Sequence, residues 1–500
     1  MRKIFVWLIL FCGICGGYMF AKSTHAQQSQ DMQQLQQEAA QLELFTAGLD
    51  QPQSSSPQVV NTNVDKPAEN SNAPPPAAAD NTSSSAHEAG VDVSTSPSPD
   101  KDAPAPSAKT STAPTDAPAD EKEKMRLDIY GFAQLDMGYD LDQNDPNWFD
   151  VMRPTKLPSS PDQFGHDGNF YSGVRQTRFG VKGYFQTPLG ELKTIFEFEL
   201  FGVGVDAGQT TFRLRHAWGE LGEFGAGQTW SPYMDPDVFP NSLEYWGPNG
   251  MVFFRNVQVR WMPVNKGNHQ IWFALERPGA SGDLGVVASR IELQNIQGRF
   301  PAPDVSARLR WGGKTAYFQF SAIGRYIAWD DIKPVVPFNF SGHTMGWGIN
   351  ASGNLPVGPR NLLKLAFVYG HGNENYMNDA PIDIAPIATP SNLTRPIDGK
   401  ALPMLSMVAF DDIKWSEKWS SSIGYSMLKL DNTALETPSD FHRGEYALVN
   451  LLHYPAKNVM VGAEFQWGHR ENFADGFDVS DHRVQVGFRY NFDFKLGGEK

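Results

Sequence analysis

The chain has 500 residues, 40% of them hydrophobic, and carries a formal net charge of −14 at pH 7. Beyond the N-terminal region no apolar run is long enough for a transmembrane helix, which excludes a helical membrane bundle. The mean hydropathy of −0.40 resembles that of a soluble protein, yet a barrel with a polar lumen and lipid-facing side chains at alternate positions gives the same average.

The first residues have the pattern of an export signal. Arg2 and Lys3 precede an apolar run from Ile4 to Phe20, and small residues around Ala26 suit a cleavage site. We therefore predict a signal peptide over residues 1–26. Because the apolar run is nearly as long as a membrane helix, an uncleaved inner-membrane anchor is the alternative.

Both cysteines of the chain, Cys12 and Cys15, lie inside this signal. Their spacing imitates a redox or metal-binding pair, but the fragment should be discarded on export. The exported chain then contains no cysteine, so it can form no disulfide and no thiolate metal site. We expect neither a metal ion nor a cofactor.

Residues 27–50 favour a short coiled-coil helix. The apolar residues at three-four spacing are Met32, Leu35, Ala39, Leu42 and Leu49. Because fewer than three heptads are marginal alone, a solvated amphipathic stretch is the alternative.

Residues 51–124 have the composition of a disordered linker. They contain no aromatic residue, no Leu and no Ile, while Pro, Ala, Ser, Thr and Asp dominate. Such a segment cannot bury enough apolar area to offset its conformational entropy. Residues 27–124 together hold 5 Lys against 15 acidic residues, a net charge of −10. We expect them to form an arm in the periplasm.

From residue 125 to residue 500, apolar and polar residues alternate in segments that indicate β-strands. In the last segment one face holds Val484, Val486, Phe488, Tyr490 and Phe492, and the other holds Arg483, Gln485, Gly487, Arg489 and Asn491. Sixteen such segments fit into this part of the chain, which we predict to be one domain.

The connections between these segments alternate in length. Short joints lie at 186–190, 219–223, 311–314 and 454–458, with slightly longer ones at 263–269 and 355–360. Long joints lie near 141–172, 231–251, 278–303, 327–342, 371–401, 429–442 and 469–481, with a shorter one at 203–209. This asymmetry is typical of periplasmic turns and extracellular loops. The predicted fold is a 16-stranded antiparallel transmembrane β-barrel, which closes without an exposed edge.

The faces opposite the apolar ones would line the lumen, and they are rich in basic residues. The candidate pore-lining residues are Arg178, Lys182, Arg213, Arg215, Arg260, Arg308 and Arg310. Rings of Arg or Lys favour anions, and the planar guanidinium suits carboxylates. Because Glu197, Glu199 and Glu464 interrupt this wall, paired charges that stiffen the barrel without selectivity are the alternative.

The third long loop, from Ser231 to Trp246, is rich in aromatic residues and proline. Such a composition suits a loop that packs inside the barrel and narrows it. We expect Asp235, Asp237 and Glu244 to face the basic wall across a transverse field. A surface lid or a contact between subunits is the alternative.

Several motifs are similar to those of the DcaP-like family of Gram-negative outer-membrane porins. They lie at 178–183, 196–202, 212–218, 226–231, 239–240, 247–248, 255–260, 449–452 and 455–458. The resemblance implies a sixteen-stranded trimeric porin with a periplasmic coiled coil and an arginine-rich pore that prefers small anions such as dicarboxylates. Carried over to this chain, the pore arginines would be among Arg178, Arg213, Arg215 and Arg260.

The sequence therefore predicts a porin in the outer membrane, through which small and preferably anionic solutes diffuse passively. The chain has no G-x-S-x-G elbow and no H-E-x-x-H pair, so we do not expect an enzyme. Expected partners are the outer-membrane lipid bilayer, two further copies of the chain and components of the cell wall such as peptidoglycan, but not nucleic acid. The alternative is a structural envelope protein whose arm tethers the outer membrane to the cell wall.

Overall fold

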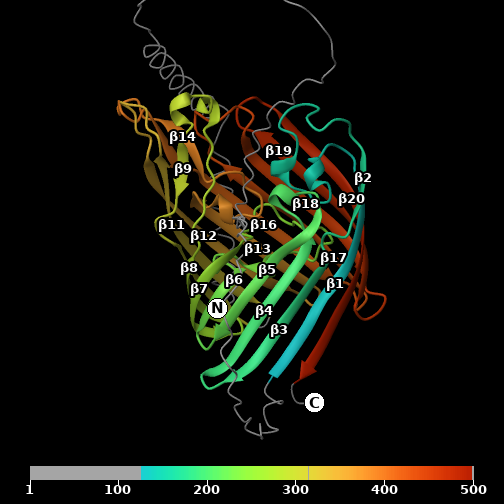
Figure 1. Ribbon diagram of the computed structural model, residues 1–500. Helices are drawn as coiled ribbons and strands as arrows, with labels where there is room; N and C mark the ends of the chain where they lie inside the picture. The colour runs from blue at the N-terminus through green and yellow to red at the C-terminus, as the bar shows by residue number, and fades with distance from the viewer. Residues whose placement is uncertain (1–124, 314, 498–500) are drawn as a thin grey trace, which may run out of the picture.

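The computed structural model describes residues 125–313 and 315–497. The signal peptide, the coiled coil and the linker predicted for residues 1–124 lie outside the described residues. The described chain forms a closed antiparallel β-barrel of sixteen strands (Figure 1), which confirms the predicted fold class and strand number.

The order of strands around the wall follows their order along the chain. The barrel strands are β1 (Met125–Asp140), β3 (Arg178–Thr187), β4 (Gly190–Phe201), β5 (Thr210–Leu221), β6 (Phe224–Trp230), β7 (Arg255–Lys266), β8 (His269–Glu276), β10 (Asp304–Gly312), β11 (Tyr317–Asp331), β12 (Gly342–Val357), β13 (Asn361–His371), β16 (Pro403–Lys414), β17 (Trp419–Leu430), β18 (Phe441–His453), β19 (Val459–Asn472) and β20 (Asp478–Gly497).

Two short strands lengthen the wall on the side of the long loops. β2 (Asn169–Gly173) pairs with the end of β1, and β9 (Ile296–Arg299) pairs with the end of β11. They therefore continue the lines of β3 and β10, which pair with the same two neighbours. A separate hairpin of β14 (Ile384–Ala388) and β15 (Ile397–Ala401) lies in the loop between β13 and β16.

The loops also contain 3-10 helices of three residues each. They are η2 (Pro146–Trp148), η3 (Pro154–Lys156), η4 (Gly204–Asp206), η5 (Pro236–Val238), η6 (Gly285–Val287), η7 (Ile291–Leu293) and η8 (Glu374–Tyr376). In the described part of the chain, no helix has the length and apolar character needed to span a membrane.

The barrel is closed by β1 and β20. Their pairing extends from Arg126 opposite Gly497 to Asp140 opposite Arg483, and the other edge of β1 pairs with β3. The backbone amides are therefore satisfied within the wall, as a sheet in lipid requires.

The connections have the predicted alternation of length. Short turns follow β3, β5, β7, β10, β12, β16 and β18, whereas long loops follow β1, β4, β6, β8, β11, β13, β17 and β19. The turn between β16 and β17, which sequence analysis did not identify, completes the short set. The first residue of β1 and the last residue of β20 both lie at the short-turn end of the barrel (Figure 1).

The alternation along the strands separates lipid-facing from inward-facing side chains. On β20, Val484 and Tyr490 expose 47% and 60% of their surface, while Arg483 and Gln485 are buried. On β7, Val257 and Val259 are exposed and the intervening Gln258 is buried. An apolar belt therefore faces outward, where lipid would cover it.

The inner face is not polar all the way round. Between β13 and β18, inward-facing Val368, Val408, Phe410, Leu428 and Leu448 belong to a hydrophobic core. The loops contribute Met152, Leu157, Tyr233, Met234, Met251, Tyr376 and Met377 to the same core. The polar lumen expected from the alternation therefore covers only part of the wall, because loops that fold inward supply apolar partners for the rest.

Candidate functional site

Four arginines surround two glutamates on the inner wall, and we call this group the arginine–glutamate cluster. Its members are Arg178 of β3, Glu197 and Glu199 of β4, Arg213 and Arg215 of β5 and Arg255 of β7. Arg215 makes the closest contacts, with Nε 2.6 Å from Glu197 Oε1 and Nη1 2.6 Å from Glu199 Oε2. Arg178, Arg213 and Arg255 approach Glu199 to 3.3, 3.8 and 3.7 Å.

A β-bulge brings His216 onto the side of the sheet where Arg213 and Arg215 already face the two glutamates. Glu197 lies opposite His216, whereas Glu199 lies opposite Arg213, so β5 has one more residue than β4 in this interval. Such a bulge breaks the simple alternation and redirects side chains. Arg213, Arg215 and His216 can therefore all approach the carboxylates of β4.

The cluster has more positive than negative charge, and part of that charge is accessible. Its two carboxylates balance two of the four guanidinium groups. The side chains of Arg215 and Arg255 are 5% and 6% exposed, but those of Arg178 and Arg213 are 24% and 21% exposed. Arg178 and Arg213 are therefore the members that a solute in the lumen can reach.

Tyrosine hydroxyl groups complete the coordination of the two glutamates. Tyr130 of β1 donates to Glu197 Oε2 at 2.6 Å, and Tyr245 of the third loop donates to Glu199 Oε1. Tyr245 also stacks on Phe201 with ring centroids 4.1 Å apart. The third loop is thus tied to the cluster, because its tyrosine shares a carboxylate with the four arginines.

Three arginines near this region were not among the sequence-predicted site residues. Arg255 is the first residue of β7. It lies in the motif at 255–260 that is similar to the porin family, so the sequence contained a signal for its role in the site. Arg175 pairs with Asp150, and Arg153 pairs with Asp379 at 2.9 Å. Arg153 and Arg175 lie in the first loop, residues 141–177, where no alternation indicates which side chains face inward.

The third loop, residues 231–254, follows the inner wall of the barrel. Its backbone carbonyls accept hydrogen bonds, in order around the wall, from Arg308, Asn350, Asn354, Lys364, Asn450 and Gln176. These donors come from β10, β12, β13, β18 and the segment before β3. The loop therefore lies inside the barrel, held by side chains from widely separated strands.

Three of the predicted basic wall residues hold this loop or its start. Arg260 donates to the carbonyl of Trp230, Arg308 to the carbonyls of Pro232 and Met234, and Arg310 to Asp237. All three face inward and are at most 5% exposed. Their guanidinium groups are thus engaged by loop oxygens, unlike those of Arg178 and Arg213.

The three predicted acidic residues of the loop separate into two groups. Asp235 and Asp237 contact Arg310, and Asp235 also accepts from Ser352 Oγ at 2.7 Å. Glu244 lies on the other side of the lumen, where it accepts from the backbone N–H groups of Met152 and Gly247. Glu244 therefore does not face a basic residue as Asp235 and Asp237 do.

Further basic residues lie beside the cluster on β3 and β20. Lys182 of β3 lies with Nζ 4.7 Å from the ring centroid of Tyr130. Arg489 of β20 lies over the ring of Phe132 at 4.6 Å, and Phe132 pairs with Arg178 across β1 and β3. Arg178 and Lys182 of β3 and Arg489 of β20 thus form a basic track on the two strands that flank β1.

No group of three or more His, Cys, Asp or Glu side chains suited to a metal ion occurs in residues 125–313 and 315–497. The chemistry available on the inner wall is therefore that of guanidinium, ammonium, carboxylate and amide groups. Such groups can attract and orient charged solutes by electrostatics and hydrogen bonding.

A closed sixteen-stranded barrel with short turns at one end, long loops at the other and a charged inner wall defines an outer-membrane porin. Within that class, the model of the DcaP outer membrane protein family matches residues 103–312. This match confirms the resemblance found in the sequence motifs.

Several solved structures of outer-membrane proteins are similar to this chain. The outer membrane channel DcaP of Acinetobacter baumannii is 19% identical, with a TM-score of 0.60 over 74% of this chain and 98% of that chain. The anion-selective porin from Comamonas acidovorans is 11% identical, with a TM-score of 0.45 over 74% of this chain and 100% of that chain. For outer-membrane expressed OmpT of Vibrio cholerae the identity is 11% and the TM-score 0.44, over 74% and 98%. No curated protein matches the chain.

Proposed function

We propose that the protein lets small solutes diffuse passively across the outer membrane and favours anionic ones such as dicarboxylates. The observation that carries this proposal is the excess of guanidinium over carboxylate groups in the arginine–glutamate cluster. A low-dielectric wall strengthens the field of these charges, which raises the local concentration of anions.

In this proposal Arg178 and Arg213 are the groups that meet the solute, because they are the exposed members of the cluster. Arg215 and Arg255 are buried and position the others through Glu197 and Glu199. Planar guanidinium groups from two strands can bind the two ends of a dicarboxylate with paired hydrogen bonds.

The third loop narrows the path in this proposal. The loop occupies the inner side of β10 to β18 and packs on the hydrophobic core there. In the proposal, the exposed arginines of β3 and β5 border the path that remains. In our proposal the loop thus directs solutes along the basic side of the lumen.

We further propose that the pore acts as a homotrimer, with its arm in the periplasm. The trimer is implied by the family resemblance. The periplasmic location of the arm is supported by the start of β1 at the short-turn end, because that end is periplasmic in this class.

The reversal potential across a planar bilayer under a salt gradient tests the anion preference. We expect the native protein to be anion-selective and Arg178→Ala with Arg213→Ala to lose most of that selectivity. The matched control is Arg290→Ala with Arg299→Ala, which removes the same charge from ion pairs outside the lumen. Equal reversal potentials for the native protein and the Arg178/Arg213 variant would contradict the proposal.

The alternative function is a structural envelope protein whose barrel is largely filled and whose arm holds the outer membrane to the cell wall. The inward-folded third loop and the core around it favour this alternative. Absence of single-channel conductance, together with loss of envelope integrity on deletion of residues 27–124, would support it over the porin.

A further inference from the structure

The two carboxylate oxygens of Glu199 hold the arginines of the cluster at different distances. Glu199 Oε2 accepts hydrogen bonds from Arg215 Nη1 at 2.6 Å and from Arg178 Nη2 at 3.3 Å. Glu199 Oε1 lies 3.8 Å from Arg213 Nη1 and 3.7 Å from Arg255 Nη2, and both distances are too long for a hydrogen bond. One oxygen of this carboxylate is therefore hydrogen-bonded to arginine and the other is not.

The hydroxyl group of Tyr245 occupies the oxygen that Arg213 and Arg255 do not reach. Tyr245 donates a hydrogen bond to Glu199 Oε1, and its hydroxyl group lies nearer to that oxygen than either guanidinium group does. The tyrosine oxygen in turn accepts from Arg215 Nη1 at 3.4 Å. Because a hydrogen bond to a carboxylate is charge-assisted and strong, the tyrosine satisfies Glu199 Oε1 in place of an arginine.

Arg213 consequently keeps its donors free. Among residues 125–313 and 315–497, no oxygen accepts a hydrogen bond from its guanidinium group, although that group has several N–H donors. Its side chain is 21% exposed, whereas that of Arg255 is 6% exposed. Of the two arginines beside Glu199 Oε1, Arg213 is therefore the one that a solute carboxylate can reach and bind with paired hydrogen bonds.

The position of Tyr245 is also fixed by the packing of its ring. The ring is stacked on Phe201, and the guanidinium group of Arg175 lies 3.9 Å from the centroid of Phe201. The next residue, Trp246, donates from Nε1 to the carbonyl of Asn378 at 2.8 Å. We therefore expect a phenylalanine in place of Tyr245 to keep the ring where it is and to remove the hydroxyl group alone.

We propose that Tyr245 is a specificity-determining residue: its hydroxyl group holds Arg213 away from Glu199 and keeps that arginine available to anionic solutes. The effect on solutes rests on the proposed anion pore, but the separation of Arg213 from Glu199 does not. Without the hydroxyl group, Glu199 Oε1 is a buried oxygen without a donor, which is costly. Arg213 then moves to that oxygen, because no other hydrogen bond holds it, and becomes less available to a solute.

Tyr245→Phe in planar bilayers tests the effect on solutes. The substitution changes no charge, so a pore that attracts anions by net charge alone would keep its selectivity. We expect the succinate concentration that halves the chloride current to rise at least about threefold, because hydrogen bonds to a charged group are lost. In an Arg213→Gln background, Tyr245→Phe should leave this concentration unchanged. No rise in the native background, or an equal rise in both backgrounds, would overturn the proposal.

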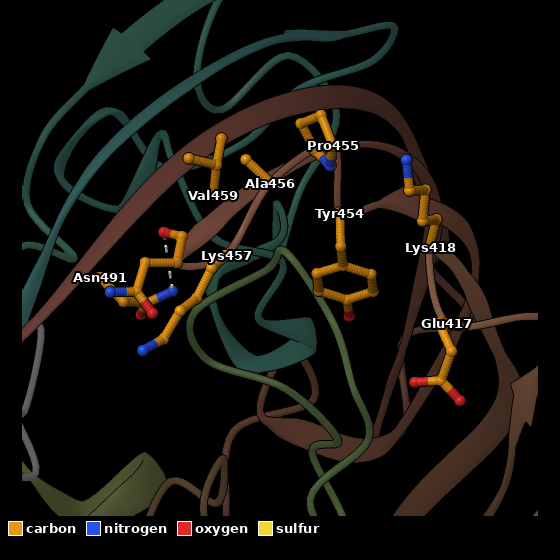
Figure 2. A pocket seen from close by; sticks show the side chains of 9 residues that line it. Glu417, Lys418, Tyr454, Pro455, Ala456, Lys457, Val459 and Asn491 are labelled. Carbon is orange, nitrogen blue, oxygen red and sulfur yellow. Dashed lines mark hydrogen bonds between the residues drawn. The ribbon is translucent and has the colours of Figure 1, made fainter.

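The matched control is Tyr454→Phe. The hydroxyl group of Tyr454 accepts a hydrogen bond from Asn241 Nδ2 of the third loop at 3.0 Å. Figure 2 shows this tyrosine in a separate pocket at the short-turn end, which Lys418 and Lys457 also line. The control therefore removes a tyrosine contact of the third loop away from the cluster, and succinate block should stay as in the native protein. An equal effect of both substitutions would overturn the proposal, because it would assign the change to the loop and not to Arg213.

The structure of the Tyr245→Phe variant, determined by crystallography or cryo-electron microscopy, tests the separation without any transport measurement. Arg213 Nη1 should move from 3.8 Å to about 2.9 Å from Glu199 Oε1. An unchanged position of Arg213 would overturn the proposal. If the native pore is not anion-selective but Arg213 does move, the proposed function fails, while the role of the hydroxyl group in holding Arg213 is supported.

Discussion

The inner wall of the barrel has two regions that differ in the chemistry of their inward-facing side chains. From β3 to β10 it presents arginines and glutamates, and buried charge is balanced by ion pairs and loop carbonyls. From β13 to β18 it presents Val, Phe and Leu, which are buried against the loops. The third loop contacts both regions: its apolar side chains pack in the hydrophobic core, and its backbone oxygens accept hydrogen bonds from both.

This difference shows how one loop can be held in place while part of the lumen stays charged. In the apolar region, burial contributes roughly 25 cal/mol of favourable free energy per Å² of apolar surface, which adds to the hydrogen bonds that Lys364 and Asn450 donate to the loop. In the charged region, hydrogen bonds fix the orientation of the loop, because each buried guanidinium group needs an oxygen atom as its partner. We therefore expect changes in the charged region to alter selectivity, and changes in the apolar region to alter stability alone.

The largest effect is expected for Glu199→Ala in the charged region. This change leaves Arg178, Arg213, Arg215 and Arg255 with Glu197 as the remaining carboxylate of the cluster, so uncompensated charge stays buried. We expect a loss of about 3–5 kcal/mol in the free energy of unfolding, together with stronger anion selectivity. Urea-induced unfolding and reversal potentials would measure the two effects.

The control for that change is Glu292→Ala, which removes an extracellular partner of Arg290. Partly exposed pairs of this kind contribute about 0–1 kcal/mol. If both variants unfold at the same urea concentration, the cluster is not the balanced network described above.

A smaller effect is expected for Leu428→Ala in the apolar region. Leu428 is fully buried on the inner face of β17, and its truncation should cost about 2–4 kcal/mol through lost burial and a residual cavity. The reversal potential should stay unchanged, because no charge moves. Ile423→Ala on the outer face of the same strand is the control, since Ile423 is 51% exposed. A shift in selectivity for Leu428→Ala would show that the two regions are not separable.

The smallest effect is expected from the pH dependence of the β17–β18 loop, which packs with other long loops through Leu435. Burial raises the pKa of Glu436 to about 7, although hydrogen bonds from Thr433 and Asn432 oppose the rise. A carboxyl group whose pKa is higher in the folded state stabilises that state fully below its unfolded value, and this contribution is lost as the pH rises through the folded value. We therefore expect the loop to loosen between pH 4.5 and about 7.

Limited proteolysis of this loop at pH 5 and pH 8 would measure the loosening. Glu436→Gln removes the titrating group and should make the cleavage rate much less dependent on pH, after correction for the pH dependence of the protease. An unchanged ratio of rates in that variant would assign the loosening to another group.

Much of the fold could be predicted from local pattern. Alternation in segments such as 483–492 predicted strands, and the lengths of the joints predicted an even-numbered barrel with two different ends. Inward-facing residues such as Arg178, Arg213 and Arg310 followed from the same two-residue period. These features depend on neighbours along the chain, so the sequence contains them directly.

The candidate site could be predicted only in part. The bulge that adds His216 to the side of Arg213 and Arg215 depends on the register between β4 and β5, which no local pattern specifies. The engagement of Arg260 and Arg308 by loop carbonyls depends on where the third loop lies. Arg153 and Arg175 lie in a loop without periodicity, so their inward position had no sequence signal.

The sequence by itself determined the barrel, its strand number and the set of basic residues on inward faces, because a two-residue period and joint lengths are local properties of the chain. Only the tertiary structure decided which arginines remain accessible, which part of the wall is apolar inside, and how the third loop passes between them. Those features arise from contacts between residues up to hundreds of positions apart, such as Arg153 with Asp379 and Asn241 with Asn450. Strand register and loop packing, which bring such residues together, are set by the whole closed sheet.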